Sequence, residues 1–311
     1  MAVLKRAVKQ IQVDELTDRA AALTYYGVLA IFPGILVLVS IVGLLGHNSA
    51  QSLIDNLGQI APGSVQSFLK SAVQNAQQQK TAAGILGIVG ILLALWSASG
   101  YVAAFMRASN RIYSMPEGRP IWKTAPTRIG VTVFTVVCLV AAIVIVVVTG
   151  SIATRVGDAL GIGSTALVVW EIAKWPVLLI LFMLMLAVLF RSAPNVRQGG
   201  IRWISPGAAL AVVIWLVASG LFGVYVANFS SYNKTYGSVA AVIIFLVWLW
   251  ISNLAILLGA EFDAELEHER ALHQGVPQES DLFAVPKDTR KLEADERVAA
   301  ERIETLRKAG S

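Results

Sequence analysis

The chain has 311 residues, of which 56% are hydrophobic and only 14% are charged, with a formal net charge of +5. A soluble domain carries about 25% charged residues, so this composition excludes an ordinary soluble enzyme or binding domain. The single cysteine, Cys138, also excludes an intrachain disulfide framework and a cysteine-based metal site.

Residues 1–13 are predicted to form a short amphipathic helix that lies in the membrane interface. Its apolar residues fall on one helical face, and Lys5, Arg6 and Lys9 fall on the opposite face. Cations at that depth contact anionic lipid headgroups, so these three side chains are expected to contact anionic lipid.

Residues 14–267 form the predicted membrane domain, because they contain six apolar stretches that each match the thickness of a bilayer. A helix needs about 20 apolar residues to cross the hydrocarbon core. The six predicted spans are approximately 22–46, 83–106, 129–152, 167–190, 207–229 and 238–260. The sequence therefore predicts an all-α, polytopic bundle of six transmembrane helices embedded in the lipid bilayer.

Two prolines, Pro33 and Pro176, lie near the middle of the first and fourth spans, and each follows an aromatic residue. A proline removes one helical hydrogen bond, so a kink is expected at each; the alternative is a broken helix whose backbone contacts a substrate. Spans two and five both carry a tryptophan followed by Ala-Ser-Gly, beginning at Trp96 and Trp215. These matches raise the hypothesis of a 3+3 inverted repeat.

Polar side chains within the spans are the candidates for a substrate cavity. Because an unpaired polar group in hydrocarbon is costly, each should face protein or water. Together with the two prolines, the candidates are Tyr25, Tyr26, Pro33, Ser99, Pro176, Ser219, Tyr225, Asn228 and Asn253. Hydrogen bonds between helices would satisfy each polar residue taken singly, and that is the favoured interpretation. Ser219, Gly223 and Ala227 recur every four residues, which is typical of a helix-packing face.

Charged residues near the span ends have structural interpretations. Glu171 and Lys174 stand one helical turn apart and are predicted to form an ion pair. Glu261, Glu265 and Glu269 share one helical face, which is interpreted as a solvated face rather than a metal site. The chain has no P-loop, no nucleophile elbow and no HExxH motif. The sequence therefore predicts no catalytic residues, no metal and no cofactor, and the protein is not expected to be an enzyme.

The last predicted unit, 268–311, is a polar tail in which 288–309 is expected to form a charged, solvated helix. Lys and Arg concentrate in the N-terminal segment and in the second and fourth loops. This distribution places both termini in the cytoplasm. It also accounts for the positive net charge. No basic and aromatic residues interleave in a way that would stack bases, so nucleic acid is not an expected partner.

Short motifs in both halves of the chain point to a known family. The second half carries Arg191-Ser192-Ala193-Pro194-Asn195-Val196, Pro206-Gly207-Ala208, Trp215, Tyr225-Val226-Ala227-Asn228-Phe229, Tyr236-Gly237-Ser238, Trp248 and Gly259-Ala260-Glu261. The first half carries Ala20-Ala21-Ala22-Leu23, Tyr25-Tyr26, Phe32-Pro33 and Asn110-Arg111-Ile112-Tyr113. Over about residues 14–267, the chain resembles the YihY/BrkB family of bacterial inner-membrane proteins.

The resemblance implies a six-span protein of the bacterial inner membrane without an established biochemical activity. The family name reflects an association with serum resistance and virulence, and some members carry the label ribonuclease BN, which is regarded as mistaken. The residues also disfavour a ribonuclease, because a metal-dependent nuclease needs convergent carboxylates or histidines. His47, His268 and His273 belong to no metal-binding motif.

Two hypotheses for function follow. The first is a carrier or flippase for an envelope lipid or another amphiphile, with the inverted halves moving relative to each other. No ATP-binding motif occurs, so an ion gradient, a concentration gradient or a partner would supply the energy. The alternative is a non-transporting scaffold or regulator of an envelope assembly. The oligomeric state is open in both.

Overall fold

The computed structural model describes residues 2–44, 80–147, 164–198, 205–228, 232–278, 280 and 282–309. In this part of the chain the regular elements are the helices α1 (Ala2–Val13), α2 (Leu16–Leu44), α5 (Lys80–Ile112), α6 (Ile121–Val147), α8 (Ser164–Ser192), α9 (Pro206–Asn228), α10 (Tyr232–His273) and α11 (Ala294–Ala309). The predicted all-α class is confirmed.

Five of the described helices are long and apolar enough to cross a membrane. The qualifying stretches are Ile88–Ile112, Ile121–Val146, Leu167–Ser192, Pro206–Asn228 and Val239–His273. They correspond to the last five predicted spans. The first predicted span, 22–46, lies largely within α2, but side chains from 32 onward lie outside the described residues. The total of six spans therefore stays a prediction.

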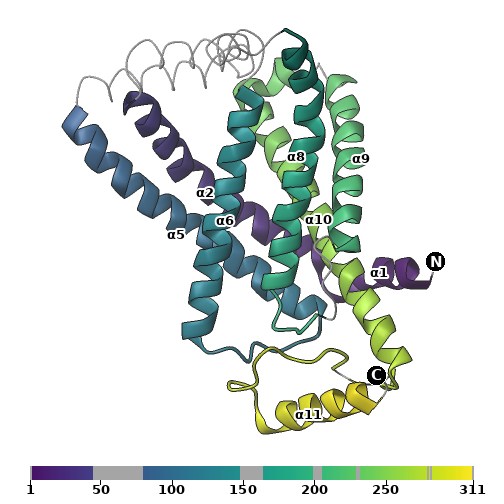
Figure 1. The fold of residues 1–311 in the computed structure, drawn as a ribbon. Coiled ribbons are helices and arrows are strands. Elements are labelled where there is room, and N and C mark those ends of the chain that lie inside the picture. Colours follow the sequence, from purple (N-terminus) through teal and green to yellow (C-terminus); the bar gives the residue numbers. More distant parts are fainter. Residues whose placement is uncertain are drawn as a thin grey trace.

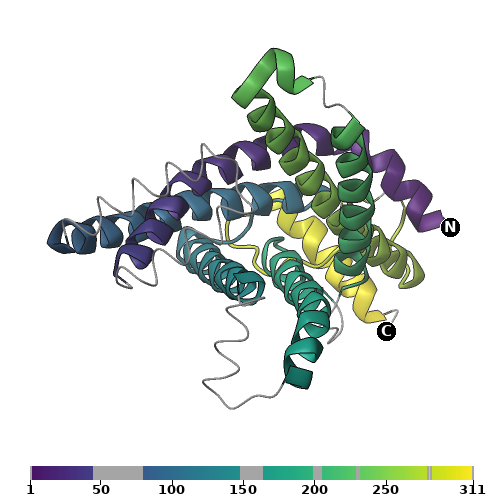
Figure 2. The same ribbon diagram turned by 90° about the horizontal axis from the view of Figure 1, so that it is seen from above.

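Consecutive long helices pack side by side as three antiparallel pairs, namely α2 with α5, α6 with α8, and α9 with α10 (Figures 1 and 2). Helix α10 also packs against α2, and α5 packs against α6, so the pairs form one bundle. Both chain termini lie at the same end of the bundle, which is called the terminal end below (Figure 1).

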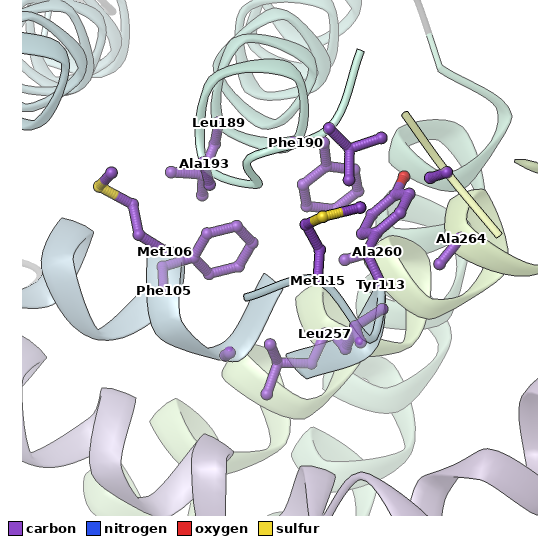
Figure 3. Packing of buried hydrophobic residues seen from close by; sticks show 14 of the residues in the cluster. Phe105, Met106, Tyr113, Met115, Leu189, Phe190, Ala193, Leu257, Ala260 and Ala264 are labelled. Atoms are coloured by element: carbon purple, nitrogen blue, oxygen red, sulfur yellow. The ribbon is translucent and has the colours of Figure 1, made fainter. Parts of the chain in front are cut away.

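The buried hydrophobic core lies at the terminal end. There the last turns of α5 meet the last turns of α8 and the second half of α10 (Figure 3). Phe105 of α5 stacks on Phe190 of α8 with ring centroids 5.9 Å apart, and both side chains are buried. Tyr113 stacks on Phe283 of the tail at 6.2 Å. The tail is therefore part of the core.

The opposite half of the bundle is packed much less within the chain. Leu92 is 63% exposed, Trp96 75% and Ile172 68%. Only 11–28% of the most apolar stretch of each described span is buried. In a membrane such side chains face lipid or an interior space, so among the described side chains the buried core is concentrated at the terminal end.

The tail docks beneath the terminal end, so the expectation of a solvated tail helix is wrong. Helix α11 begins at Ala294, later than the predicted 288, and buries Ala300 and Ile303. The segment before it pairs with the chain after α8, where the Arg197 N–H donates to the Val285 carbonyl at 2.7 Å. The tail covers the bundle because its apolar side chains complete the core.

Helix α10 extends beyond its predicted end at 260 and continues to His273. It therefore crosses the predicted boundary between 267 and 268, and one continuous helix joins the membrane domain to the tail. The extension is stable because Ala264 and Ala271 are buried on one face, and helix α1 packs against it.

Candidate functional site

Polar side chains within the spans hydrogen-bond between helices. Asn253 of α10 accepts from the Tyr101 hydroxyl at 2.8 Å and donates to the Thr24 hydroxyl at 3.0 Å. It thereby links α10 to α5 and to α2. The Ser219 hydroxyl accepts from the Trp248 indole at 3.2 Å. The Ser99 hydroxyl accepts from Arg128 at 2.8 Å. These contacts match the favoured interpretation that interhelical bonding satisfies the polar groups.

The other polar cavity candidates lie at exposed or partly exposed positions of their helices. Tyr25 and Tyr225 are 61% and 54% exposed. Asn228 is exposed and donates to the Val224 carbonyl of its own helix at 2.8 Å. Tyr26 packs edge-on against Tyr25 with centroids 5.5 Å apart, and Arg107 lies over its ring.

The two prolines lie inside continuous helices, so the broken-helix alternative is wrong. Helix α8 runs unbroken through Pro176, and α2 runs unbroken through Pro33. Pro176 is exposed, and the side chain of Pro33 lies outside the described residues. Nearby, Glu171 and Lys174 form the predicted ion pair.

Helices α9 and α10 approach each other closely, but not at the predicted packing face of Ser219, Gly223 and Ala227. A Cβ at Gly223 would meet no atom within 4 Å, and Ala227 is exposed. Of this face in the described part of the chain, only the Ser219 end is seen to contact another helix, through the hydrogen bond from Trp248 of α10. By contrast, a Cβ at Gly207 would lie 2.1 Å from the carbonyl oxygen of Gly259. Here α9 and α10 touch backbone to backbone.

Asn195 is the central polar residue of the terminal end, and its side chain is fully buried. Its backbone N–H donates to Asn110 Oδ1 at 2.7 Å. Its side-chain amide donates to the Asp288 carbonyl at 2.9 Å and accepts from the Asp288 N–H at 3.1 Å. It also donates to the Pro116 carbonyl at 3.2 Å. One side chain therefore ties the loop after α5, the loop after α8 and the tail together.

Glu117 and Arg119 form an ion pair beside this cluster. Arg119 Nη2 lies 2.7 Å from Glu117, and the guanidinium also donates to the carbonyls of Ser192 and Ala193. Burial alone would raise the pKa of Glu117, but hydrogen bonds from Arg119 and Asn110 lower it below its usual value. Glu117 therefore stays ionised and holds Arg119 against the end of α8.

On the α10 extension Glu265 and Glu267 are buried and paired, and the half-buried Glu269 is paired as well, so the interpretation of this acidic surface as a solvated face is wrong. Glu265 accepts from Arg6 of α1 at 2.8 Å, and Arg6 also pairs with Glu269. Glu267 accepts from Arg307 of α11 at 2.7 Å. Helices α1 and α11 are thus each tied to α10 by an arginine that pairs with its glutamates. Arg6, expected to contact lipid, is engaged by these carboxylates, whereas the side chains of Lys5 and Lys9 lie outside the described residues.

Glu261 and Asp14 are further buried carboxyl groups at the terminal end. Glu261 is 1% exposed, and its Oε2 atom has no hydrogen-bond partner among the described residues. Burial raises the pKa of Asp14 to about 6, although Arg111 and Arg19 oppose the shift. No group of three His, Cys, Asp or Glu side chains in the described chain is arranged to hold a metal ion.

Sequence reasoning missed this site because its residues belong to segments far apart in the chain. Two signals pointed toward it. The α10 extension is acidic, while α1 and α11 carry the complementary Arg6 and Arg307. Two of the motifs quoted above, around Asn110 and Asn195, also turn out to be direct contact partners.

Removing the Arg307 guanidinium is expected to release α11 from the bundle. Arg307→Ala leaves the buried Glu267 paired only with Arg270, at 3.1 Å, and breaking one side of such a buried pair costs about 3 kcal/mol. Hydrogen–deuterium exchange should increase across residues 294–309. The matched control is Arg302→Ala, because Arg302 is exposed on the same helix; equal exchange in the two variants would contradict the docking role.

The fold and this site define a class: a multi-pass helical membrane protein in which the motif-bearing segments close one end of the bundle. The sequence profile described as "Virulence factor BrkB" matches residues 7–281. The chain therefore belongs to the BrkB family.

Several curated proteins are similar over nearly the whole chain. A ribonuclease-like protein of Bacillus subtilis, YfkH, is 29% identical over 88% of this chain and 98% of its own length. A UPF0761 membrane protein of Alkalilimnicola ehrlichii is 30% identical over 87% of this chain and 59% of its own length. One of Alteromonas mediterranea is 28% identical over 88% and 92%. No solved structure matches the chain.

Proposed function

We propose that the protein is a carrier or flippase for an envelope lipid or a similar amphiphile. It would act in the bacterial cytoplasmic membrane, with both termini and the docked tail in the cytoplasm. The charge distribution of the loops supports this orientation. The terminal end is then the cytoplasmic end.

One observation carries the proposal: the described side chains of the spans are tightly packed at one end and lightly packed at the other. In the terminal half, Phe105, Leu186 and Leu257 are fully buried on three different spans. In the opposite half, exposed apolar side chains such as Leu92, Trp96 and Ile172 predominate on two of the same spans. A transporter that works by alternating access has a state in which the bundle is closed at one side of the membrane and can open at the other. Tight packing at one end and light packing at the other fit such a state.

The amphiphile class follows from the chemistry of the exposed half. Its surface is almost entirely aliphatic and aromatic, which suits acyl chains rather than ions or sugars. A lipid reaches such helices from the side, through the bilayer. No charged path across the membrane is then required.

Reconstitution into liposomes tests the transport proposal. The vesicles contain a trace of phospholipid with a fluorescent headgroup, and an impermeant reductant bleaches the outer leaflet. If the protein moves lipid, the inner-leaflet pool is bleached as well. Bleaching that stops at the outer-leaflet pool, in vesicles shown to contain folded protein, would contradict transport.

The scaffold alternative has one observation in its favour. Gly220 and Gly223 on α9 have open space where a Cβ would be, so this face of the helix can accept another helix closely. A protein that binds a partner there and moves no lipid would give the negative result in the liposome assay. Its binding to the partner would also depend on the open space at Gly223. A bulky Gly223→Leu substitution should then reduce crosslinking to the partner in cells.

A further inference from the structure

Glu261 is a buried carboxyl group to which the contacts described above assign no role. It lies on α10 one turn after Leu257, a fully buried member of the core at the terminal end (Figure 3). The Glu261 side chain is 1% exposed, and its Oε2 atom has no hydrogen-bond partner among the described residues. Arg6, the described arginine of α1 that reaches α10, pairs with Glu265 and Glu269 instead.

The charged groups that act on Glu261 are themselves acidic. Among the described residues, Asp14 in the turn between α1 and α2 and Glu265 on α10 interact with it electrostatically. Helix α9, which packs against α10, carries no charged residue. The two nearest arginines are engaged by these acids, because Arg111 of α5 lies 3.5 Å from Asp14 and Arg6 pairs with Glu265.

An ionised Glu261 would therefore be a buried, unpaired negative charge beside two other acids. Such a charge is costly to bury, so the carboxylate requires a positive partner or a proton. No group of three His, Cys, Asp or Glu side chains in the described ranges is arranged to hold a metal ion. A proton neutralises the carboxylate without further ligands. Carboxyl groups buried at membrane helices commonly belong to proton relays.

Asp14 connects this site to water. Its own side chain is buried, but the side chains of its partner Arg111 and its neighbour Glu15 are 57% and 66% exposed. Burial raises the pKa of Asp14 to about 6; Glu265 and Glu15 add to the shift, and Arg111 and Arg19 oppose it. A carboxyl group with such a pKa releases and rebinds a proton near neutral pH, as a relay group must.

We propose that Glu261 is a proton-binding site and that Asp14 relays the proton between Glu261 and water at the terminal end. Binding adds one proton to a carboxylate oxygen of Glu261. Release passes it to the Asp14 carboxylate and then to water, so no other reactant is consumed. A proton gradient then drives the carrier. This coupling rests on the transport function proposed above, whereas proton binding itself does not.

Infrared difference spectroscopy on the full-length protein in lipid nanodiscs tests the proton site. A protonated carboxyl group gives a C=O stretching band that an ionised one lacks. At neutral pH, where Asp14 is mostly ionised, we expect one such band in the wild type that disappears at alkaline pH. It should be absent from Glu261→Gln and shifted in Glu261→Asp, which retains a carboxyl group. Wild-type bands that all persist in Glu261→Gln, or that never respond to pH, would overturn the site.

Two further variants complete this experiment. Glu301→Gln is the matched control, because Glu301 is exposed on α11, and its spectrum should keep the band. Asp14→Asn should also keep the band, but the band should respond more slowly after a pH jump because the relay group is lost. A response as fast as in the wild type would exclude Asp14 from the route.

The stability of the protein gives a second readout for Asp14. Its pKa is raised from 3.8 to about 6 on folding, so the folded chain binds the additional proton between these values. The contribution of Asp14 to the free energy of unfolding is therefore full below a pH of about 4 and is lost as the pH rises through about 6. Thermal unfolding in detergent should show this decline in the wild type and a weaker one in Asp14→Asn. The same decline in both would contradict a role for Asp14.

A pH gradient across the liposome membrane tests the coupling. The liposome assay above is repeated with equal and with unequal pH on the two sides. We expect the gradient to change the distribution of the labelled lipid between the leaflets for the wild type but not for Glu261→Gln. Lipid movement that ignores the gradient in the wild type would overturn the coupling and leave transport intact. If no lipid moves at all, transport is contradicted, and the infrared band still decides the proton site.

Discussion

Gly259→Ala is expected to destabilise the bundle by about 3 kcal/mol, because it forces a methyl group into a backbone contact that cannot yield. The new Cβ would lie 2.4 Å from the Gly207 carbonyl oxygen and 2.6 Å from the Ala211 Cβ. Helices α9 and α10 would have to separate at the terminal end. Thermal unfolding in detergent, followed by intrinsic fluorescence, measures the loss.

The matched control for this prediction is Gly223→Ala on α9. Its Cβ meets nothing within 4 Å, and alanine is the better helix former by about 1 kcal/mol. This variant should be as stable as the wild type or slightly more stable. If Gly259→Ala is equally well tolerated, the contact between Gly207 and Gly259 does not set the spacing of α9 and α10.

Asn195→Ala is expected to free the tail from the bundle. The side-chain amide makes three hydrogen bonds, and alanine leaves the buried N–H and carbonyl of Asp288 without their partners. Each unsatisfied buried group costs about 1–3 kcal/mol, so the tail should detach before the spans unfold. Limited proteolysis should then cut within 282–293 much faster than in the wild type.

Asn228→Ala is the corresponding control, since Asn228 is exposed and donates only to its own helix. Its proteolysis should match that of the wild type. Cleavage rates unchanged in Asn195→Ala would show that the apolar contacts of Phe283 and Leu292 suffice to hold the tail. Asn195 would then be a minor contact.

The spans could be predicted from the sequence because a segment in lipid must be apolar and must satisfy its backbone hydrogen bonds internally. A continuous apolar run of bilayer length has few alternatives to a membrane helix, and five such helices lie where hydropathy placed them. The polar residues of the spans followed the same rule. Asn253 and Ser219 bond to neighbouring helices because an unpaired amide or hydroxyl in hydrocarbon is costly.

The terminal end could not be predicted in the same way, because its contacts join residues far apart in the chain. Asn195 and Asp288 are 93 positions apart, and no local period links them. The acidic face of α10 has the spacing of a solvated helix. It is buried because α1 and α11 cover it with Arg6 and Arg307. Likewise, the regular spacing of Ser219, Gly223 and Ala227 suggested a packing face. The close backbone contact between α9 and α10 instead lies at Gly207 and Gly259.

The most direct test of the proposed transport cycle is a distance measurement at two depths of the same helix pair. In a Cys138→Ser background, spin labels at Leu92→Cys and Val168→Cys report on the lightly packed halves of α5 and α8. Labels at Arg111→Cys and Arg191→Cys report on their terminal ends. In lipid nanodiscs, we expect at least two distance populations for the first pair and a single narrow one for the second. A single narrow distribution at both depths would mean that the bundle does not open, and would contradict the transport proposal.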